Sequence, residues 1–328
     1  MTKFLEERKK AGFSIEDTCR ILQVNSRRLR RWKELEVERG SMEDMRQGPK
    51  NPLNRLTLRE ITWITSMGVD AKYSHLSYRE ACIKARELDI VHASFSSFYR
   101  VWKSLGLING CFRKSGHVSN RKVPAPKIKE IANCPNRVWS WDFTYVWTGS
   151  SWLYLLCILD VYSRRLMSWK VCERMTDDVA IELWDETLLR YNLFLESFRP
   201  CQLISFSDHG SQMTSNDTKD FFEKMKIPME YARYKVPEDN SIHESFHKTL
   251  KHDKNFEYYF WKVSSKVELE VYMENMEKIY NYERYHSSLG YTTPNQMYMG
   301  ESQKIIAKRE AKNREARLNR IKFNKLLL

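Results

Sequence analysis

The sequence predicts an α/β protein in which a mixed sheet flanked by helices follows smaller all-helical units. Residues 138–171 contain three strand-like runs separated by turn residues, the pattern of an antiparallel meander. Helical and strand-like segments then alternate as far as residue 250, as expected when helices cover a sheet. Residues 2–38 and 55–108 instead show helical periodicity with capping signals, which indicates two helical units.

The first helical unit, within residues 1–40, has the order of a helix-turn-helix. A helix to about Lys10 is broken at Gly12, and Ser14, with Asp17 three residues later, caps a second helix from Ile15 to Leu22. A short turn over residues 24–26 leads into a third helix. Its cations are Arg27, Arg28, Arg30, Arg31 and Lys33. Such a helix favours binding in the major groove of DNA, since clustered cations repel one another without a phosphate partner. A solvated basic helix is the alternative.

Glycine and proline residues predict a linker over residues 41–54, before the second helical unit at 55–108. Capping-box patterns occur at residues 57–60 and 77–80. Its last helix, near Ser96 to Leu105, carries core-spaced apolar residues: Phe98, Val101, Trp102 and Leu105. The unit is interpreted either as a second DNA-reading module or as a structural domain.

A basic segment over residues 109–135 mixes Gly, Pro and cations, and is expected to form no core. We predict an interdomain linker there that follows phosphates, with Arg121 and Lys122 among its DNA contacts.

The central region, residues 136–300, carries the sheet. We predict strands at Val138–Val146, Trp152–Asp160, Arg165–Val171, Gln202–Ser207 and Ile227–Tyr231, and helices from Thr176 to Arg190, from Ser215 to Met225 and from Asp239 or Asn240 onward. The order βββ-α-β-α-β-α matches a ribonuclease-H-like fold with a mixed five-stranded sheet. The tryptophans of this region are expected mainly in the core. Residues 301–328 predict a basic C-terminal helix that lies on DNA or on a second subunit.

Charge is unevenly distributed along the 328 residues, whose formal net charge is +13. Residues 1–130 hold 27 Lys/Arg and 15 Asp/Glu, residues 131–300 hold 19 and 24, and residues 301–328 hold 9 and 3. Basic ends around a slightly acidic middle fit DNA-binding arms on a catalytic core. Basic ends that serve only solubility are the alternative.

Seven scattered cysteines without a Cys-x-x-Cys pair, and histidines without zinc-finger spacing, argue against structural zinc. We read the cysteines as reduced thiols. The charged N-terminus and the longest apolar run, Trp152 to Leu159, are unlike a signal or a bilayer span. We therefore expect a cytoplasmic, nucleoid-associated bacterial protein without membrane contact.

Three acids have motifs suited to metal binding. Asp142 lies on the polar face of the first strand, Asp208 ends the fourth strand, and Glu244 follows 35 residues later on a helix. Adjacent strands would bring the two aspartates together, where a divalent cation relieves their repulsion. Magnesium prefers such oxygen ligands, and a pair of ions drives phosphodiester chemistry. Lys248 and Lys251 follow Glu244 on one helical stripe that faces DNA, although a Glu244–Lys248 salt bridge is the alternative role of that acid.

These acids and their surroundings resemble the Asp-Asp-Glu signature of retroviral integrases and related bacterial insertion-sequence transposases. The resemblance covers about residues 50–300. The matching motifs are Asn136-x-x-Trp139-x-x-Asp142-x-Thr144, Asp160-x-x-Ser163-Arg164, Ser207-Asp208-x-Gly210-Ser211, Asp239-Asn240-x-x-x-Glu244-Ser245 with Lys251, and Asn281-x-x-Arg284-x-His286-x-x-Leu289-Gly290-Tyr291-x-x-Pro294.

The resemblance implies a homo-oligomeric transposase that acts on double-stranded DNA, both element ends and target. It would bind terminal inverted repeats, nick a strand with two Mg²⁺ ions, for which Mn²⁺ can substitute, and join the 3′-hydroxyl to another phosphodiester. It also implies that Asp142, Asp208 and Glu244 are the catalytic metal ligands and that Lys251 contacts the DNA end.

The chain departs from the family pattern at two places. It lacks a glycine in residues 232–237, and His209 replaces a common Gln. Helix-turn-helix-like segments stand in place of the retroviral zinc unit. Two other functions stay open, a DNA-binding regulator with an unused core and a nuclease that cuts without joining.

Overall fold

The computed structural model describes residues 7, 10–21, 24–40, 52–73, 75–108, 128–233, 236–252 and 260–327. It divides into two compact units, Met1–Pro52 and Leu53–Leu328. The first unit contains α2 (Ile15–Ile21) and α3 (Ser26–Arg39). The second begins with α4 (Leu58–Val69), α5 (Tyr78–Glu87), α6 (Phe95–Ser104) and α7 (Ile128–Ile131).

The remaining elements of the second unit form the sheet and its surroundings. The strands are β1 (Val138–Trp147), β2 (Trp152–Asp160), β3 (Leu166–Cys172), β4 (Ile204–Ser207) and β5 (Met229–Tyr231). The α-helices are α8 (Asp177–Arg190), α9 (Ser211–Thr214), α10 (Asn216–Lys224), α11 (Ser241–His252), α13 (Lys266–Lys278), α14 (Pro294–Tyr298) and α15 (Ser302–Lys325). Short helical turns are η1 (Glu196–Phe198), η2 (Pro237–Asn240), η3 (Ile279–Glu283) and η4 (Ser287–Leu289).

In the first unit, α2 and α3 pack through a small apolar contact. Cys19 and Leu29 are buried there, and Trp32 packs against them. The Asn25 side chain caps α3 by accepting a hydrogen bond from the Arg27 amide at 2.8 Å. The cations of α3 stay exposed, as predicted: Arg27, Arg28, Arg30, Arg31 and Lys33. The second and third predicted helices are present as α2 and α3, whereas most of the helix predicted up to Lys10 and of the linker predicted at 41–54 lies outside the described residues. DNA binding by α3 stays a prediction.

Helices α4, α5 and α6 enclose a core of their own. Both predicted capping boxes are present, at the starts of α4 and α5, where side chain and backbone satisfy each other reciprocally. The indole Nε1 of Trp102 donates to the Ile64 carbonyl at 2.9 Å and so joins α6 to α4. One core prediction is wrong: Leu105 is 44% exposed, because α6 ends at Ser104 and the chain turns away.

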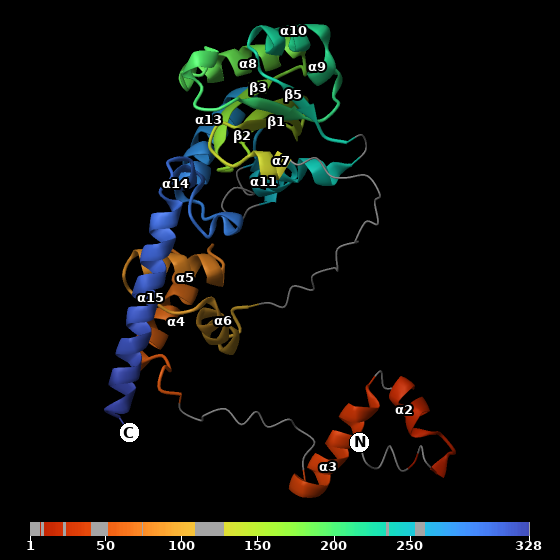
Figure 1. The fold of residues 1–328 in the computed structure, drawn as a ribbon, viewed down its shortest axis with the longest axis vertical. Coiled ribbons are helices and arrows are strands. Elements are labelled where there is room, and N and C mark those ends of the chain that lie inside the picture. The colour runs from red at the N-terminus through yellow and green to blue at the C-terminus, as the bar shows by residue number, and fades with distance from the viewer. Residues whose placement is uncertain are drawn as a thin grey trace. The chain divides into compact units, whose positions relative to one another are not determined.

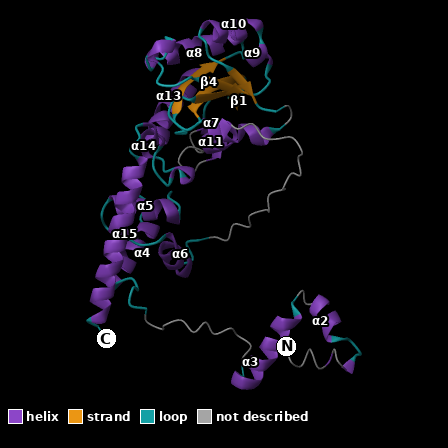
Figure 2. Cartoon of the chain, viewed as in Figure 1, coloured by secondary structure: helices purple, strands orange, loops and turns teal. Residues whose placement is uncertain are grey.

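The sheet has the order β3-β2-β1-β4-β5 within the described residues. Figure 2 shows its strands in orange, with helices around them. Strands β1, β2 and β3 pair antiparallel as the predicted meander, whereas β4 pairs parallel with β1 and with β5. Parallel pairing requires a crossover, and α8 supplies the one between β3 and β4. This mixed topology is the predicted ribonuclease-H-like fold.

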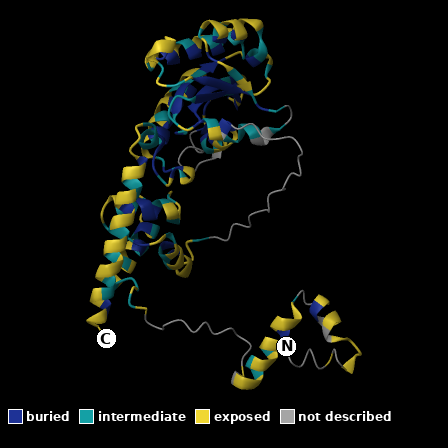
Figure 3. Ribbon diagram, in the orientation of Figure 1, coloured by how far each residue is buried: buried dark blue, intermediate teal, exposed yellow. Residues whose placement is uncertain are grey.

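Helices cover both faces of the sheet (Figure 1). On one face, Trp139 and Trp141 of β1 pack against Trp184 of α8 and Phe222 of α10. On the other face, α11 and α13 pack against the opposite side chains of β1, β2 and β3. Successive side chains of β1 thus point into two different cores, one on each face of the sheet. The buried strands lie between these cores (Figure 3).

Several local predictions need correction. The segment 109–135 was expected to form no core, but Ile128 and Ala132, at α7, are buried beside β1 and β4; Arg121 and Lys122 lie outside the described residues. Thr176 makes no side-chain cap on α8. Trp147 and Trp152 are half-exposed, because the β1–β2 hairpin extends beyond the helices that cover the sheet.

The C-terminal helix was predicted and is present as α15, but it contacts its own chain. Arg309 forms an ion pair with Glu87 of α5 at 2.7 Å, and Arg320 forms one with Glu60 of α4 at 2.7 Å. The Asn324 side chain donates to the Leu53 carbonyl at 2.7 Å. Two of the cations of α15, Arg309 and Arg320, therefore bind acids of α5 and α4, while binding of this helix to DNA stays a prediction. Among the described helices, none has the length and apolarity needed to cross a bilayer.

Candidate active site

The two aspartates of the candidate site come from neighbouring strands. β1 and β4 are parallel, and Ser140 lies beside Phe206 in their register. Two residues further along each strand direction, the same register places Asp142 beside Asp208. The polar face of β1 therefore brings these carboxylates to the carboxyl end of β4, where open sheets commonly bind ligands.

The Asp208 carboxylate is oriented by a tight turn. Its Oδ1 accepts a hydrogen bond from the Gly210 amide at 2.9 Å. Gly210 permits this close approach, because a Cβ there would lie 2.6 Å from Met213 Sδ and 3.2 Å from Asp208 Oδ1. Asp208 itself is exposed. The predicted Ser-Asp-His-Gly-Ser motif is thus a turn that presents an accessible carboxylate.

Helix α11 brings Glu244 to the same place. One pocket, with a volume of about 550 Å³, is lined by all three acids. Its lining residues are Asp142, Asp208, His209, Gly210, Ala232, Arg233, Val236, Asn240, Glu244 and His247. Glu244 is exposed on the pocket wall, and none of the ion pairs found among the described residues joins it to Lys248. The salt-bridge alternative for Glu244 therefore has no support in this geometry.

Asp142 is the most strongly perturbed of the three acids. Burial, followed by the negative charge of Asp208, raises the pKa of Asp142 from 3.8 to about 7. The Asn240 amide opposes this effect by donating to Asp142 Oδ2 at 2.9 Å. The negative charges of Asp142 and Asp208 repel each other, so a cation bound between them would stabilise both.

The loop before α11 is held by an ion pair. The Arg233 guanidinium donates to both oxygens of Asp239 at 2.8 Å, and the Arg233 amide donates to Asp239 at 3.0 Å. The helix predicted to begin at Asp239 or Asn240 begins at Ser241, directly after these residues. Their side chains bind Arg233 and Asp142, and a hydrogen bond to a charged partner is stronger than one between neutral groups.

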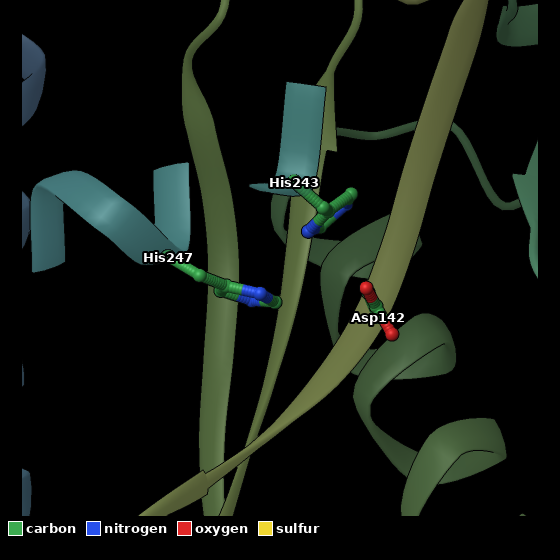
Figure 4. A group of neighbouring side chains, drawn as sticks. All are labelled: Asp142, His243 and His247. Carbon is green, nitrogen blue, oxygen red and sulfur yellow. The ribbon is translucent and has the colours of Figure 1, made fainter. Parts of the chain in front are cut away.

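Two buried histidines of α11 lie behind the acids. His243 and His247 are four residues apart on one helical face, and both rings lie near Asp142 (Figure 4). Burial lowers the pKa of His243 to about 4, against a smaller opposing effect of the Ser140 carbonyl. Burial and the charge state of His243 hold the pKa of His247 well below its usual range. The expectation that no histidines have zinc-ligand spacing is therefore wrong, because His243 and His247 form a His-x-x-x-His pair that is visible in the sequence.

The lysines of α11 differ from each other. Lys248 is exposed, as expected for a DNA contact. Lys251 instead turns toward β1, where its Nζ donates to Thr144 Oγ1 at 2.7 Å and to the Tyr145 carbonyl at 3.0 Å. Lys251 thus binds two oxygens of β1, and its contact with a DNA end stays a prediction.

Asp160 serves the fold and does not line the pocket. Its buried carboxylate accepts hydrogen bonds from the Asn136 amide at 2.9 Å and from the Ser163 amide at 2.8 Å. These bonds fix the turn between β2 and β3, which was the structural alternative for this acid.

The donor set of the pocket fits a hard divalent cation. Three carboxylates on three separate elements supply oxygen ligands, which Mg²⁺ prefers and binds together with waters. A bound cation would also relieve the repulsion that raises the pKa of Asp142. His209, which replaces a glutamine of the family pattern, stacks on Tyr231 at 5.1 Å and borders the same pocket.

Comparison with known proteins gives matches in the central region of the chain. Two family models, both described as integrase core domain, match residues 132–237 and 225–294. The transposase for insertion sequence element IS904 of Lactococcus lactis is 32% identical over 163 residues, 50% of this chain and 61% of that protein. A 31 kDa protein of insertion element IS600 from Shigella sonnei is 35% identical over 181 residues, 54% of this chain and 63% of that protein. The matches thus span less than two thirds of each relative.

Solved structures that the chain matches include an integrase catalytic core domain and a chain of an intasome. The catalytic core domain of HTLV-2 integrase in complex with magnesium is 17% identical, covers 51% of this chain and 99% of that chain, and has a TM-score of 0.39. A chain of the simian T-cell lymphotropic virus intasome in complex with the PP2A subunit B56 gamma is 13% identical, covers 69% and 72%, and has a TM-score of 0.44.

Proposed function

Because residues 132–294 are an integrase core domain related to the transposases of bacterial insertion sequences, we propose that this protein is a DNA transposase. It would bind the terminal inverted repeats of its element, cleave one strand at each end and join the 3′-hydroxyl to target DNA. The single observation that supports this most strongly is the pocket lined by Asp142, Asp208 and Glu244.

We assign the metal ligands to these three carboxylates. Two Mg²⁺ ions, or Mn²⁺ in their place, would supply Lewis acidity to the phosphate and a means to deprotonate the attacking water or 3′-hydroxyl. Asp142 and Asp208 approach from adjacent strands, and Glu244 approaches from α11. Asn240 holds one oxygen of Asp142, and the Gly210 amide holds one oxygen of Asp208, so that the remaining oxygens point to a fixed centre.

The protein groups around the acids limit how the substrate enters. Asp208 and Glu244 are exposed, whereas Asp142 is partly covered. A scissile phosphate would therefore enter the pocket from the solvent side, past Asp208 and Glu244. Arg233 borders the pocket, but Asp239 engages its guanidinium, so its first role is to position the loop that carries Asn240. Lys248 is the exposed cation on α11 that would meet the DNA backbone, and Arg121 and Lys122 would follow phosphates upstream.

DNA recognition is assigned to the first unit. The exposed arginines of α3 would contact phosphates and base edges, with Arg28 braced on the Trp32 ring at 5.0 Å. Two DNA ends must be brought together for integration, so we propose a homo-oligomer on DNA. Its activity places it with the bacterial nucleoid in the cytoplasm.

The test is a strand assay on the DNA that flanks the gene. Wild-type protein and the Asp142→Ala variant are incubated with labelled ends and Mg²⁺ or Mn²⁺, and strands are resolved on a denaturing gel. We expect metal-dependent nicks and longer joined products with the wild type alone. Nicks without joined products would identify a nuclease, and binding by both proteins without nicks would identify a regulator.

A further inference from the structure

Three side chains beneath the carboxylate pocket have the make-up of a transition-metal site. Asp142, His243 and His247 each offer one ligand atom, and these atoms lie within 4.8 Å of one another. Figure 4 shows the two imidazole rings of α11 beside the Asp142 carboxylate of β1. Tetrahedral zinc at about 2.0–2.1 Å from its ligands requires ligand atoms roughly 3.3 Å apart, so small side-chain rotations would close the site.

The two histidines lack ordinary partners. His243 is fully buried, and neither of its ring nitrogens has a hydrogen-bond partner of good geometry; the same holds for Nε2 of His247. Buried polar atoms are nearly always satisfied; the Ser140 carbonyl approaches one nitrogen of His243, which leaves its other nitrogen and Nε2 of His247 to be explained. A metal ion would satisfy one nitrogen of each ring. The Ser140 carbonyl beside His243 would then orient that ring from behind, as backbone carbonyls do for metal-bound histidines.

The local sequence supports the same interpretation. Residues 243–247 read His-Glu-Ser-Phe-His within α11, and two histidines at i and i+4 on a helix face a common ion. In this chain the pattern supplies ligand spacing and not a reaction, because the third nearby ligand is Asp142 of β1.

We propose that Asp142, His243 and His247 form a second metal site, selective for Zn²⁺ over Mg²⁺, that shares Asp142 with the carboxylate pocket. Imidazole ligands suit zinc, whereas Mg²⁺ prefers oxygen. When Asp142 binds an ion together with the histidines, it can no longer bind Mg²⁺ together with Asp208 and Glu244. Zinc is therefore an inhibitor that competes with Mg²⁺, a consequence that rests on the proposed function, whereas zinc binding itself does not.

The first test measures binding without reference to activity. Metal-free full-length protein is titrated with Co²⁺ and with Zn²⁺ in excess Mg²⁺, and bound metal is followed by Co²⁺ visible absorption and equilibrium dialysis. We expect one tight site per chain and at least about a tenfold weaker affinity in both His243→Gln and His247→Gln. The two variants differ in burial, and circular dichroism checks the fold of each, so a folding defect in one leaves the other informative.

Matched controls exclude other ligands. His209→Gln removes a histidine at the rim of the same pocket, and His75→Gln removes an exposed one. Cys134 and Cys201, whose sulfurs are 3.6 Å apart, are replaced together by serine, since thiolate ligands would add a charge-transfer band with Co²⁺. Unchanged affinity in these controls supports the proposal. Equal affinity in the wild type and both α11 variants, or loss of the site in the cysteine variant, overturns it.

The second test concerns competition. In the strand assay, the zinc concentration that halves cleavage should rise with Mg²⁺, and the ratio of rates with and without zinc should approach one in His247→Gln. Zinc inhibition that is independent of Mg²⁺ overturns the shared use of Asp142. A protein without strand cleavage refutes the proposed function but leaves the binding test decisive for the zinc site.

Discussion

The raised pKa of Asp142 makes a prediction about folding stability. A carboxyl whose pKa is higher in the folded than in the unfolded state holds its proton more tightly when folded. Its contribution therefore lowers the free energy of unfolding as pH rises from 3.8 to about 7, and the full cost remains above pH 7. Asparagine at this position is neutral at every pH and keeps an oxygen that accepts from Asn240. We predict that Asp142→Asn stabilises the metal-free protein at pH 8.

The magnitude follows from the pKa values. One unit of pKa corresponds to about 1.4 kcal/mol, so a change from 3.8 to about 7 corresponds to about 4 kcal/mol. Because Asp142 is partly accessible through the pocket, this figure is an upper limit. At pH 5 Asp142 is mostly protonated, so most of the destabilisation by its charge is absent. The stability that Asp142→Asn adds should therefore be below about 2 kcal/mol at this pH. The pKa of Asp160, raised by burial to about 6, affects both proteins equally and cancels from the comparison.

The assay is urea unfolding with EDTA, for wild type and Asp142→Asn, at pH 5 and pH 8. The stability difference between the two proteins should grow with pH. Mg²⁺ should then stabilise the wild type at pH 8 more than the variant, since the ligand binds the folded state. A variant that is no more stable than the wild type at pH 8, or a difference independent of pH, refutes the argument.

Three further predictions concern the surroundings of the site. Asp239→Asn removes the charge of the ion pair with Arg233. This variant should lower the apparent Mg²⁺ affinity more than the cleavage rate at saturating metal, as a Mg²⁺ titration of cleavage would show. Trp184→Ala opens a cavity between α8 and the sheet and should cost about 3–5 kcal/mol, measured by urea unfolding; an unchanged midpoint would contradict the packing. Arg309→Gln breaks the pair with Glu87, so amide exchange in α15 should accelerate while the sheet stays protected.

Much of the core fold could be predicted because β1 and β2 have an unambiguous pattern. The period-two alternation of residues 139–145 divides two buried faces, and the apolar run of β2 has a core on each side. Neighbouring strands such as β1 and β4 are far apart in the sequence, so no local signal predicts their pairing. It could be predicted only from the βββ-α-β-α-β-α order of the elements. The close approach of Asp142 and Asp208 followed from that pairing.

Other features depended on tertiary contacts that no local pattern records. Lys251 is predicted to contact DNA, and no local pattern shows that its ammonium also binds Thr144 of β1. No local pattern shows either that Asp239 forms an ion pair with Arg233. The basic helix α15 shows no single apolar stripe, so its docking on α4 and α5 through buried charges could not be read from periodicity.

The central claim is that Asp142, Asp208 and Glu244 act as one metal-dependent site. The most direct test compares single-turnover strand cleavage for the three single alanine variants, the triple variant and Glu230→Gln, an exposed acid on β5 that serves as control. If the acids act as a unit, each single variant should lose about as much activity as the triple variant, and the control should keep wild-type rates. Losses that simply add across the three positions, or a single variant that retains cleavage, would contradict the account.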